Sequence, residues 1–207
     1  MGMFEEMQKY LAKVTPSRSP ILKEMEEHAK RHGFPIIGPL VGRLLYQLAV
    51  ITNAKRILEL GSGYGYSAFW FSMAAGSRGR LTLTDSNPDN KKMALNYFKR
   101  AGLRSRFDFK IGDSLDVIKK MDGPFDIILN DIDKQDYPKT INLVAPRLKK
   151  GGLFITDNMI WGGDVYRKNP DAATKGIIEF TDKLYKDKRF FTTIMPIRDG
   201  VALALRI

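Results

Sequence analysis

A glycine-rich turn between a short apolar run and a helix-like segment constrains the fold of this chain most. The run 56–60 stops at Gly61-Ser62-Gly63-Tyr64-Gly65, and a helical pattern follows from residue 66. Glycine tolerates positive φ and has no Cβ, so a ligand can lie against such a turn. The first N–H groups of the following helix are unpaired and suit a carboxylate or phosphate. The pattern predicts strand, tight turn and helix. In the alternative interpretation, the glycines only shape the corner.

The next acidic residue at a predicted strand end favours the ligand-binding interpretation. Asp85 closes the apolar run 80–85, about 20 residues beyond Gly65, the spacing at which nucleoside-binding folds place a carboxylate on the ribose hydroxyls. The sequence therefore predicts a nucleoside site at the carboxyl ends of these two strands.

Length and composition exclude several classes of protein. The chain has 207 residues and no cysteine, so it fits one domain, and disulfides and thiolate metal sites are excluded. No apolar run is long enough to span a bilayer, and the N-terminal residues lack the layout of a signal peptide. We therefore expect one domain over residues 1–207 in a soluble, cytoplasmic protein without membrane contact.

The formal net charge of +11 favours anionic partners through electrostatic attraction. The basic residues are spread along the chain, however, and solvated helix faces account for such a distribution equally well. Charge alone therefore does not establish nucleic-acid binding.

Strand and helix patterns alternate after an N-terminal helical region at 1–52. Strands are expected at 56–60, 80–85, 106–111, 125–130 and 152–157. Helices are expected from Ser19-Pro20, Asn87-Pro88, Ser114, Tyr137-Pro138 (ending at Lys149-Lys150-Gly151-Gly152) and Asn169-Pro170. Residues 53–207 thus predict a doubly wound, mostly parallel α/β sheet. The chain should end in an antiparallel hairpin with a tight Asp199-Gly200 turn.

Acidic residues follow five successive predicted strands. They are Glu59, Asp85, Asp113, Asp131 and the pair Asp157-Asn158. Because ligands bind at the shared carboxyl edge of a parallel sheet, these side chains should surround one site. Asp131, Asp157 and Asn158 offer hard oxygen ligands without His or Cys, which favours Mg²⁺, Mn²⁺ or Ca²⁺ over zinc. Alternatively, Asp157-Asn158 only caps a turn. Lys134, in the same loop as Asp131, is a candidate base or carboxylate partner, and the alternative is a solvated lysine.

At these residues the chain resembles the cation-dependent, S-adenosylmethionine-dependent O-methyltransferases, the catechol and caffeoyl-CoA methyltransferase family. The resemblance runs from about Ser19 to the C-terminus. Its motifs are Leu58-Glu59-Leu60-Gly61 through Gly65-Tyr66-Ser67, Asp131-Ile132-Asp133-Lys134 with Tyr137, Thr156-Asp157-Asn158, and Pro196-Ile197-Arg198-Asp199-Gly200. The turn at 61–65 is richer in glycine than is usual in this family.

The resemblance implies a class I methyltransferase fold, S-adenosylmethionine as cofactor, a divalent cation (first of all Mg²⁺) and a homodimer. It implies cofactor contacts by Ile37, Glu59, Gly61, Ser62, Gly63, Tyr66, Ser67, Asp85, Ser86, Asp113, Ser114 and Asp131. It also implies metal ligation by Asp131, Asp157 and Asn158, and catalysis by Lys134 and Asp131.

The implied substrate carries two vicinal oxygens. A catechol-like small molecule qualifies, and so does 5-hydroxyuridine in tRNA, on which some bacterial relatives act. Two other classes stay open at this point. A nicotinamide-dependent oxidoreductase has the same glycine-rich turn. The Asp157-Asn158 pair and the terminal hairpin argue against that class. A non-catalytic RNA-binding module on the same fold has no use for Glu59, Asp85 and Asp131.

Overall fold

The structure, a computed structural model, describes residues 3–16 and 18–207, with the side chains of residues 3–5 outside the description. Residues 1, 2 and 17 of the predicted N-terminal helical region lie outside the described residues. The strands are β1 (Arg56–Leu60), β2 (Arg80–Asp85), β3 (Arg106–Ile111), β4 (Phe125–Asn130), β5 (Leu148–Thr156), β6 (Phe190–Met195) and β7 (Val201–Arg206). The helices are α1 (Met3–Val14), α2 (Pro20–His32), α3 (Gly38–Ile51), α4 (Tyr66–Ala75), α5 (Pro88–Arg100), α6 (Ser114–Lys119), α7 (Tyr137–Val144) and α8 (Ala172–Lys186), with 3-10 turns η1 (Gly76–Arg78), η2 (Lys134–Asp136), η3 (Ala145–Arg147) and η4 (Trp161–Tyr166).

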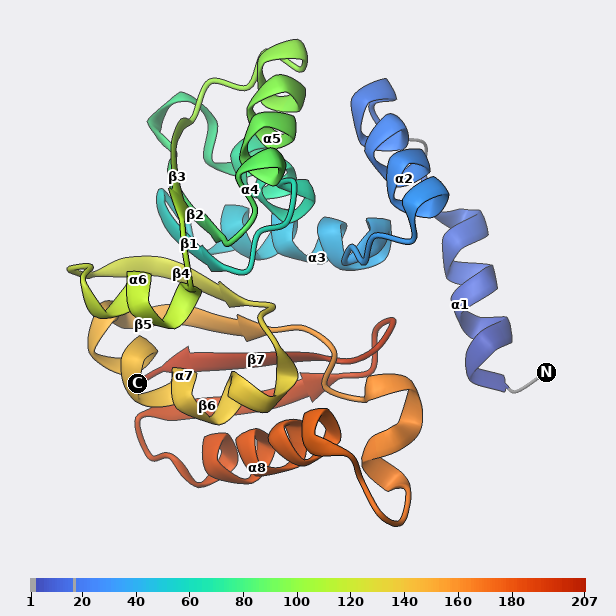
Figure 1. Cartoon of the computed structure of the whole chain (residues 1–207), viewed down its shortest axis with the longest axis vertical. Coiled ribbons are helices and arrows are strands. Elements are labelled where there is room, and N and C mark those ends of the chain that lie inside the picture. The colour runs from blue at the N-terminus through green and yellow to red at the C-terminus, as the bar shows by residue number, and fades with distance from the viewer. Residues whose placement is uncertain (1–2, 17) are drawn as a thin grey trace.

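The strands form one seven-stranded sheet in the order β3-β2-β1-β4-β5-β7-β6 (Figure 1). The first five strands are parallel, whereas β7 runs antiparallel to both β5 and β6. The order reverses between β1 and β4, where ligands bind in open α/β sheets. The predicted fold, with its mostly parallel sheet and C-terminal antiparallel hairpin, is confirmed.

Neighbouring residues of each central strand point to opposite faces of the sheet, and each face has its own apolar core. Ile57 faces the core shared with α2, α3, α4 and α5. Leu58 faces the core shared with α6, α7 and α8. Continuous apolar strands such as β4 therefore reflect burial on both faces, as expected of a parallel sheet.

The strand register brings the predicted acidic residues to one level. Leu60 of β1 pairs with both Thr84 of β2 and Asn130 of β4, and Asn130 pairs with Thr156 of β5. The residue after each partner is Gly61, Asp85, Asp131 and Asp157, respectively. The sheet thus sets these four positions side by side at its carboxyl edge.

One predicted helix end is wrong. Residues 149–152 were expected to stop a helix, yet α7 ends at Val144 and β5 already begins at Leu148. Two lysines followed by glycines resemble a helix terminus. Here they form an irregular start of β5, where the pairing with β4 shifts register between Phe125 and Ile127.

Two other boundaries also differ from the prediction. The last helix begins at Ala172, capped by the Asp171 carboxylate, which accepts a hydrogen bond from the Thr174 N–H at 2.7 Å. Asn169-Pro170 lies outside it, because its own residues supply no cap. The hairpin strands are joined by the five residues 196–200 rather than by a two-residue turn. This longer loop matters below, since it carries Arg198.

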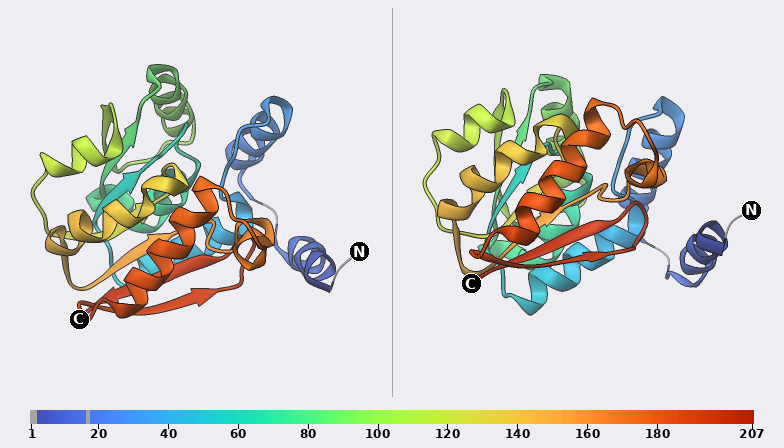
Figure 2. Two further views of the ribbon diagram at one scale, coloured as in Figure 1. Left: turned by 60° about the horizontal axis from the view of Figure 1, so that its bottom comes forward. Right: turned by 90° about the horizontal axis from the view of Figure 1, so that it is seen from below.

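The N-terminal helix α1 stands off the body of the molecule in both views of Figure 2. By contrast, α2 buries Leu22, Met25 and Ala29, and α3 buries Val41 and Leu45. No helix within the described residues has the length and apolarity needed to cross a membrane.

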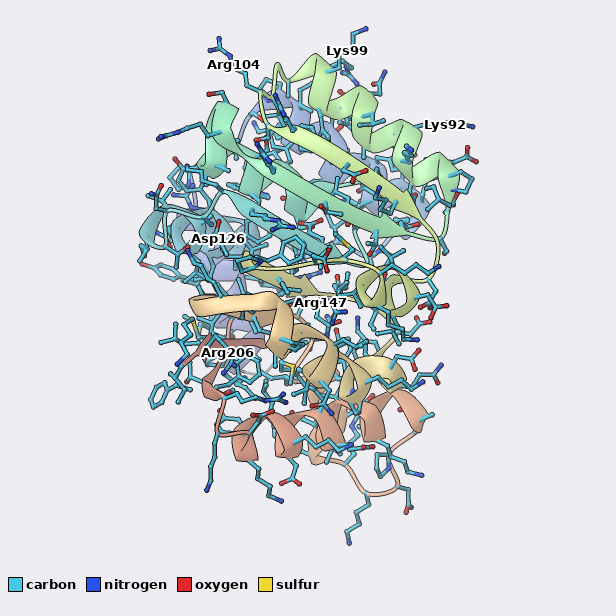
Figure 3. The ribbon with its side chains drawn as sticks, turned by 90° about the vertical axis from the view of Figure 1, so that its left-hand side faces the viewer. Lys92, Lys99, Arg104, Asp126, Arg147 and Arg206 are labelled. Atoms are coloured by element: carbon cyan, nitrogen blue, oxygen red, sulfur yellow. The ribbon has the colours of Figure 1, made fainter. Side chains whose placement is uncertain are left out.

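The basic residues divide into outward-pointing and folded-back side chains. Figure 3 shows Lys92, Lys99 and Arg104 projecting outward at the end of the molecule near α5. Arg147 instead donates hydrogen bonds to the carbonyls of Met121, Leu143 and Lys119. Part of the positive charge therefore supports the fold rather than forming an open basic surface.

Candidate active site

A cavity of about 740 Å³ opens at the carboxyl edge of the sheet, around the point where the strand order reverses. Of the predicted site residues, Ile37, Gly61, Ser62, Gly63, Tyr66, Ser67, Asp85, Ser86, Asp113, Ser114, Asp131, Lys134, Asp157 and Asn158 line it. The predicted nucleoside side and the predicted metal side thus share one cavity.

All three glycines of the turn have positive φ, at 78° for Gly61, 49° for Gly63 and 84° for Gly65. A Cβ added at Gly61 would overlap the carbonyl oxygen of Asp131, and one at Gly63 or Gly65 would lie 2.9 or 2.5 Å from the ring of Phe34 or Phe98. Backbone conformation and protein packing therefore already require these glycines. The close approach of a ligand, predicted from the sequence, is not needed to explain them.

Hydroxyl groups tie the turn to its neighbours. The Thr84 hydroxyl donates to the Glu59 carbonyl at 2.8 Å, accepts from the Gly61 N–H at 3.2 Å and lies 2.7 Å from the Ser114 hydroxyl. The Ser62 hydroxyl accepts from the Thr84 N–H at 3.2 Å. Hydrogen bonds within the protein thus connect the ends of β1 and β2 to the start of α6 without a ligand.

Asp85 is oriented by the protein itself. One carboxylate oxygen accepts from the Gly63 N–H at 3.0 Å. The other accepts from the Asn87 N–H at 2.8 Å and the Asn90 side-chain amide at 3.0 Å. On the next strand end, Asp113 caps α6 by accepting from the Asp116 N–H at 3.0 Å. Both carboxylates are held in place at the rim of the cavity.

Glu59 differs from the other predicted site residues because it does not line the cavity. It is fully buried behind the glycine turn, and neither carboxylate oxygen receives a hydrogen bond from the described residues. Burial raises the pKa of Glu59 to about 8, although the nearby Ser67 and Ser62 hydroxyls oppose that rise. A buried carboxyl group without a partner is well suited to a cationic group that enters from the cavity side.

Lys134 lies at the opposite side of the cavity and is directed at Asp131. Its Nζ donates to Asp131 Oδ1 at 2.8 Å and to the Ile132 carbonyl at 3.2 Å. The ammonium group also lies 5.2 Å from the ring centre of Tyr137 and 5.6 Å from that of Trp161. Only 12% of the side chain is exposed, so Lys134 is a fixed cation rather than a solvated lysine.

Asp157 is buried at the end of β5, with its Oδ1 atom lacking a hydrogen-bond partner among the described residues. Burial, and next the charge of Asp131, raise the pKa of Asp157 to about 7, while Arg198 opposes the shift. Its backbone carbonyl accepts from the buried Tyr137 hydroxyl at 3.0 Å. The adjacent Asn158 has a left-handed φ of 60° and donates through its side-chain amide to Asp199 at 3.1 Å.

The side-chain oxygens of Asp131, Asp157 and Asn158 are chemically compatible with a hard divalent cation. Two carboxylates and one amide meet at one edge, and a buried carboxylate oxygen without a partner is the kind of atom that a cation would satisfy. Within the described part of the chain, no cluster of three His, Cys, Asp or Glu side chains could hold a metal ion. A cation here would therefore depend on the Asn158 amide and on oxygens from outside the chain.

Several residues that line the cavity were not predicted as site residues, and Phe34 and Arg198 are two whose position bears on its chemistry. Phe34 lines it from the Pro-rich segment before α3 and packs over Gly63. Arg198 lines it from the β6–β7 loop, with Nη1 3.8 Å from Asp157 Oδ2. Arg198 was noticed only as part of a motif, because nothing in the sequence shows that this loop folds over the sheet edge.

Comparison with known proteins identifies the family. The O-methyltransferase family model matches residues 12–207. Caffeoyl-CoA O-methyltransferase 3 of Nicotiana tabacum is 30% identical over 210 residues, which cover 94% of this chain and 86% of the relative. Catechol O-methyltransferase of Niastella koreensis is 30% identical over 215 residues, covering 98% of this chain and 97% of the relative.

Solved structures agree with the sequence relatives. The O-methyltransferase TomG from Streptomyces achromogenes, in complex with SAM, has a TM-score of 0.88 at 25% identity, covering 100% of this chain and 99% of that one. The O-methyltransferase from Bacillus cereus, in complex with SAH, has a TM-score of 0.86 at 26% identity, covering 99% and 100%. The resemblance stated from the motifs is confirmed: this chain belongs to the O-methyltransferase family.

Proposed function

We propose that this O-methyltransferase moves a methyl group from S-adenosylmethionine to one of two vicinal oxygens on a catechol-like small molecule, assisted by a divalent cation. The observation that carries the proposal is the shared cavity. An oriented acid of the nucleoside-binding type, Asp85, lines the same space as Asp131, Asp157 and Lys134. A methyl donor and an oxygen acceptor could therefore meet within it.

The cofactor assignment is supported from both sides. Structural relatives are solved in complex with SAM or SAH. In this chain Asp85 would accept the ribose hydroxyls, while Asp113 and Ser114 would lie along the adenine. Glu59 and Ser67 would face the ammonium and carboxylate of the methionine part, where the partnerless buried carboxyl of Glu59 gains a counter-charge.

The cation assignment is supported by the oxygen donors at the ends of β4 and β5. Asp131, Asp157 and Asn158 would hold the ion. A bound divalent cation would supply Lewis acidity, which favours the ionised form of an acceptor hydroxyl. The catechol and caffeoyl-CoA relatives act on compounds with adjacent oxygens, as their names state.

Lys134 would act on the acceptor oxygen. Its ammonium group is fixed between Asp131 and two aromatic rings, so it is positioned before the substrate binds. As an ammonium group it would steady the oxyanion of the acceptor by a hydrogen bond, and only as the neutral amine would it accept the proton of the hydroxyl. The apolar rings of Phe34 and Trp161 offer surfaces for a flat substrate and exclude water from the reacting atoms.

A tRNA bearing 5-hydroxyuridine is the second candidate substrate, favoured by the net charge of +11. Several basic side chains, however, already pair with acids on their own helix, such as Lys119 with Asp116 and Lys186 with Asp182. A nucleic-acid enzyme is expected to show one coherent basic face. A catechol-like small molecule therefore remains the first candidate substrate.

A homodimer is part of the proposal. Helix α1 stands off the body, and exposed apolar side chains occur on both α1 and α3. These are Met7, Tyr10, Val14, Tyr46, Val50 and Ile51. A second copy of the chain would cover them.

The experiment is transfer of labelled methyl from S-adenosylmethionine to caffeate and to tRNA carrying 5-hydroxyuridine, each with Mg²⁺ or with chelator. Metal-dependent label in caffeate supports the proposal. Label in tRNA with caffeate poor would replace the small molecule by RNA. Label that is insensitive to chelator would remove the cation from the mechanism.

A further inference from the structure

The residue with the least explained position in the cavity is Arg198. It has a φ of 52°, in the left-handed region that glycine adopts freely and that side chains rarely adopt. Glycine or asparagine would suit such a loop position better. An arginine there strains the backbone, although a hydrogen bond from the Gly200 N–H to the Ile197 carbonyl at 2.9 Å spans the turn.

Among the described residues, the guanidinium group of Arg198 has an ion-pair partner only at long range. Its nearest acid is Asp157, at 3.8 Å, which is too long for a direct hydrogen bond. Adjacent Asp199 is already engaged, because its oxygens accept from the Gly162 N–H at 2.7 Å and from the Asn158 amide at 3.1 Å. The Arg198 side chain is 40% exposed, and it faces the cavity with donors to spare.

The stem of Arg198 lies against the start of α3. Its Nε and Cδ lie 3.5 and 3.7 Å from the position of a Cβ on Gly38, at the start of α3. The side chain therefore reaches from the β6–β7 loop to the α3 side, beside Ile37. A group placed near Asp157 has Arg198 as a cationic neighbour.

We propose that Arg198 determines substrate specificity by binding an anionic substituent, a carboxylate, on the aromatic acceptor. This assignment rests on the proposed function and narrows its substrate class to catechols that carry a negative charge away from the reacting oxygens. A guanidinium group presents paired N–H donors that match a carboxylate, and such charge-assisted bonds are stronger than neutral ones. Lys134, which is bound to Asp131, does not compete for this role.

The test uses three catechols whose ring substituent at the same position is anionic (3,4-dihydroxybenzoate), neutral (4-methylcatechol) or cationic (dopamine). For each acceptor, kcat/KM is measured with S-adenosylmethionine and Mg²⁺. The wild-type chain should prefer the anionic acceptor over the neutral one, and the cationic acceptor should be poorest. The preference should weaken as salt is raised, because the Arg198 side chain is partly exposed.

Arg198→Gly removes the charge and suits the left-handed backbone, so misfolding is not the expected result. It should lower the ratio of anionic to neutral kcat/KM by about tenfold or more, with most of the change in KM. Arg198→Lys should keep part of the ratio. Arg104→Gly is the matched control, since Arg104 is an exposed arginine in the loop after α5 at the far end of the molecule (Figure 3). It should leave the ratio unchanged.

Equilibrium binding of the same three compounds, with S-adenosylhomocysteine present, separates this assignment from the reaction proposed above. Methylation of all three acceptors with an unchanged ratio in Arg198→Gly would overturn the role of Arg198 and keep the reaction. Arg198-dependent binding of the anion without any methyl transfer would overturn the reaction and keep the role of Arg198. The absence of both binding and methyl transfer would overturn the role of Arg198 and the reaction.

Discussion

The two sides of the cavity hold their acids in different ways. On the β1–β2–β3 side, Asp85 and Asp113 accept hydrogen bonds from backbone N–H groups. On the β4–β5 side, Asp131 and Asp157 face side-chain cations, and Asp157 keeps an oxygen without a partner. Backbone donors hold a carboxylate in one geometry, whereas a buried carboxylate such as Asp157, 3.8 Å from Arg198, favours added positive charge. The β1–β2–β3 side therefore holds its carboxylates in a fixed geometry. The β4–β5 side favours added positive charge and is the charge-receiving side.

The largest expected effect comes from removing an acid on the charge-receiving side. Asp157→Ala should lower metal-stimulated turnover by about two to three powers of ten, since cation charge stabilisation is worth several kcal/mol. Cofactor affinity should change little, because the proposal places the cofactor on the other side. Steady-state kinetics with a metal titration, together with calorimetry of cofactor binding, measure both quantities.

Asp108→Ala is the control for this variant, because Asp108 is an acid of the edge strand β3 that pairs with Lys110. It should affect neither turnover nor binding. Loss of cofactor binding in Asp157→Ala, with metal stimulation intact, would contradict the division between the two sides.

Gly61 joins the two sides, since its missing Cβ leaves room for the Asp131 carbonyl. Gly61→Ala should destabilise the fold by about 2–4 kcal/mol, combining left-handed backbone strain with overpacking. Urea denaturation measures the change. Gly33→Ala is the matched control, with a similar φ of 61° and open space around the added Cβ. It should cost only about 1–2 kcal/mol. Equal costs for both variants would show that the contact is not tight.

Glu59 is the exception on the β1–β2–β3 side, because among the described residues no backbone N–H group donates to its buried carboxyl group. Its folded-state pKa of about 8 lies above the ordinary 4.5, so the folded state retains a proton that the unfolded state loses between these values. Without ligand, the unfolding free energy should fall as pH rises through this window, by up to about 1.4 kcal/mol per pH unit. Below pH 4.5 and above pH 8 this contribution should be flat.

Denaturation at several pH values should show that Glu59→Gln removes the Glu59 part of this slope, most clearly between pH 7 and 8, above the raised pKa of Asp157 of about 7. Glu27→Gln, at an exposed position of α2, should preserve it. A slope between pH 7 and 8 that survives in Glu59→Gln would contradict the assignment to Glu59, whereas a slope below pH 7 is also expected from Asp157.

The smallest expected effect concerns one donor to Asp85. Asn90→Ala removes a hydrogen bond of 3.0 Å and should weaken cofactor binding about fivefold, equivalent to roughly 1 kcal/mol. Calorimetry measures the affinity. Asn142→Ala, which removes an amide bonded to Arg189 on another part of the surface, should bind the cofactor as the wild type does. An equal loss in both variants would indicate a general effect on the fold.

The sequence predicted the central parallel strands well because their buried parts are short apolar runs that end at a glycine or an acid, as at Leu60-Gly61 and Thr84-Asp85. The same signals predicted which acids meet, since strand ends in a parallel sheet share one edge. Prediction was wrong at Lys149–Gly152, where local residues resemble a helix end but tertiary pairing with β4 makes a strand. Local pattern alone does not encode that pairing.

The sequence predicted which acids come together at the site better than it predicted the contacts and charges around them. The sequence places Asp131 and Lys134 three residues apart, but the contact between them needs the fold of η2. It gave no sign that Glu59 lies behind the cavity wall or that Arg198 lies against the start of α3. Both facts depend on loop conformation and side-chain packing between elements far apart in the chain.

The left-handed backbone at Arg198 also bears on how this protein could evolve. Every arginine codon becomes a glycine codon through a single change of its first base. At this position that change would relax the backbone while it removes the cationic donor. The mutation that erases a preference for acidic acceptors is thus both genetically close and tolerated by the fold. Acceptor choice at this loop can drift between lineages while the sheet edge beneath it stays fixed.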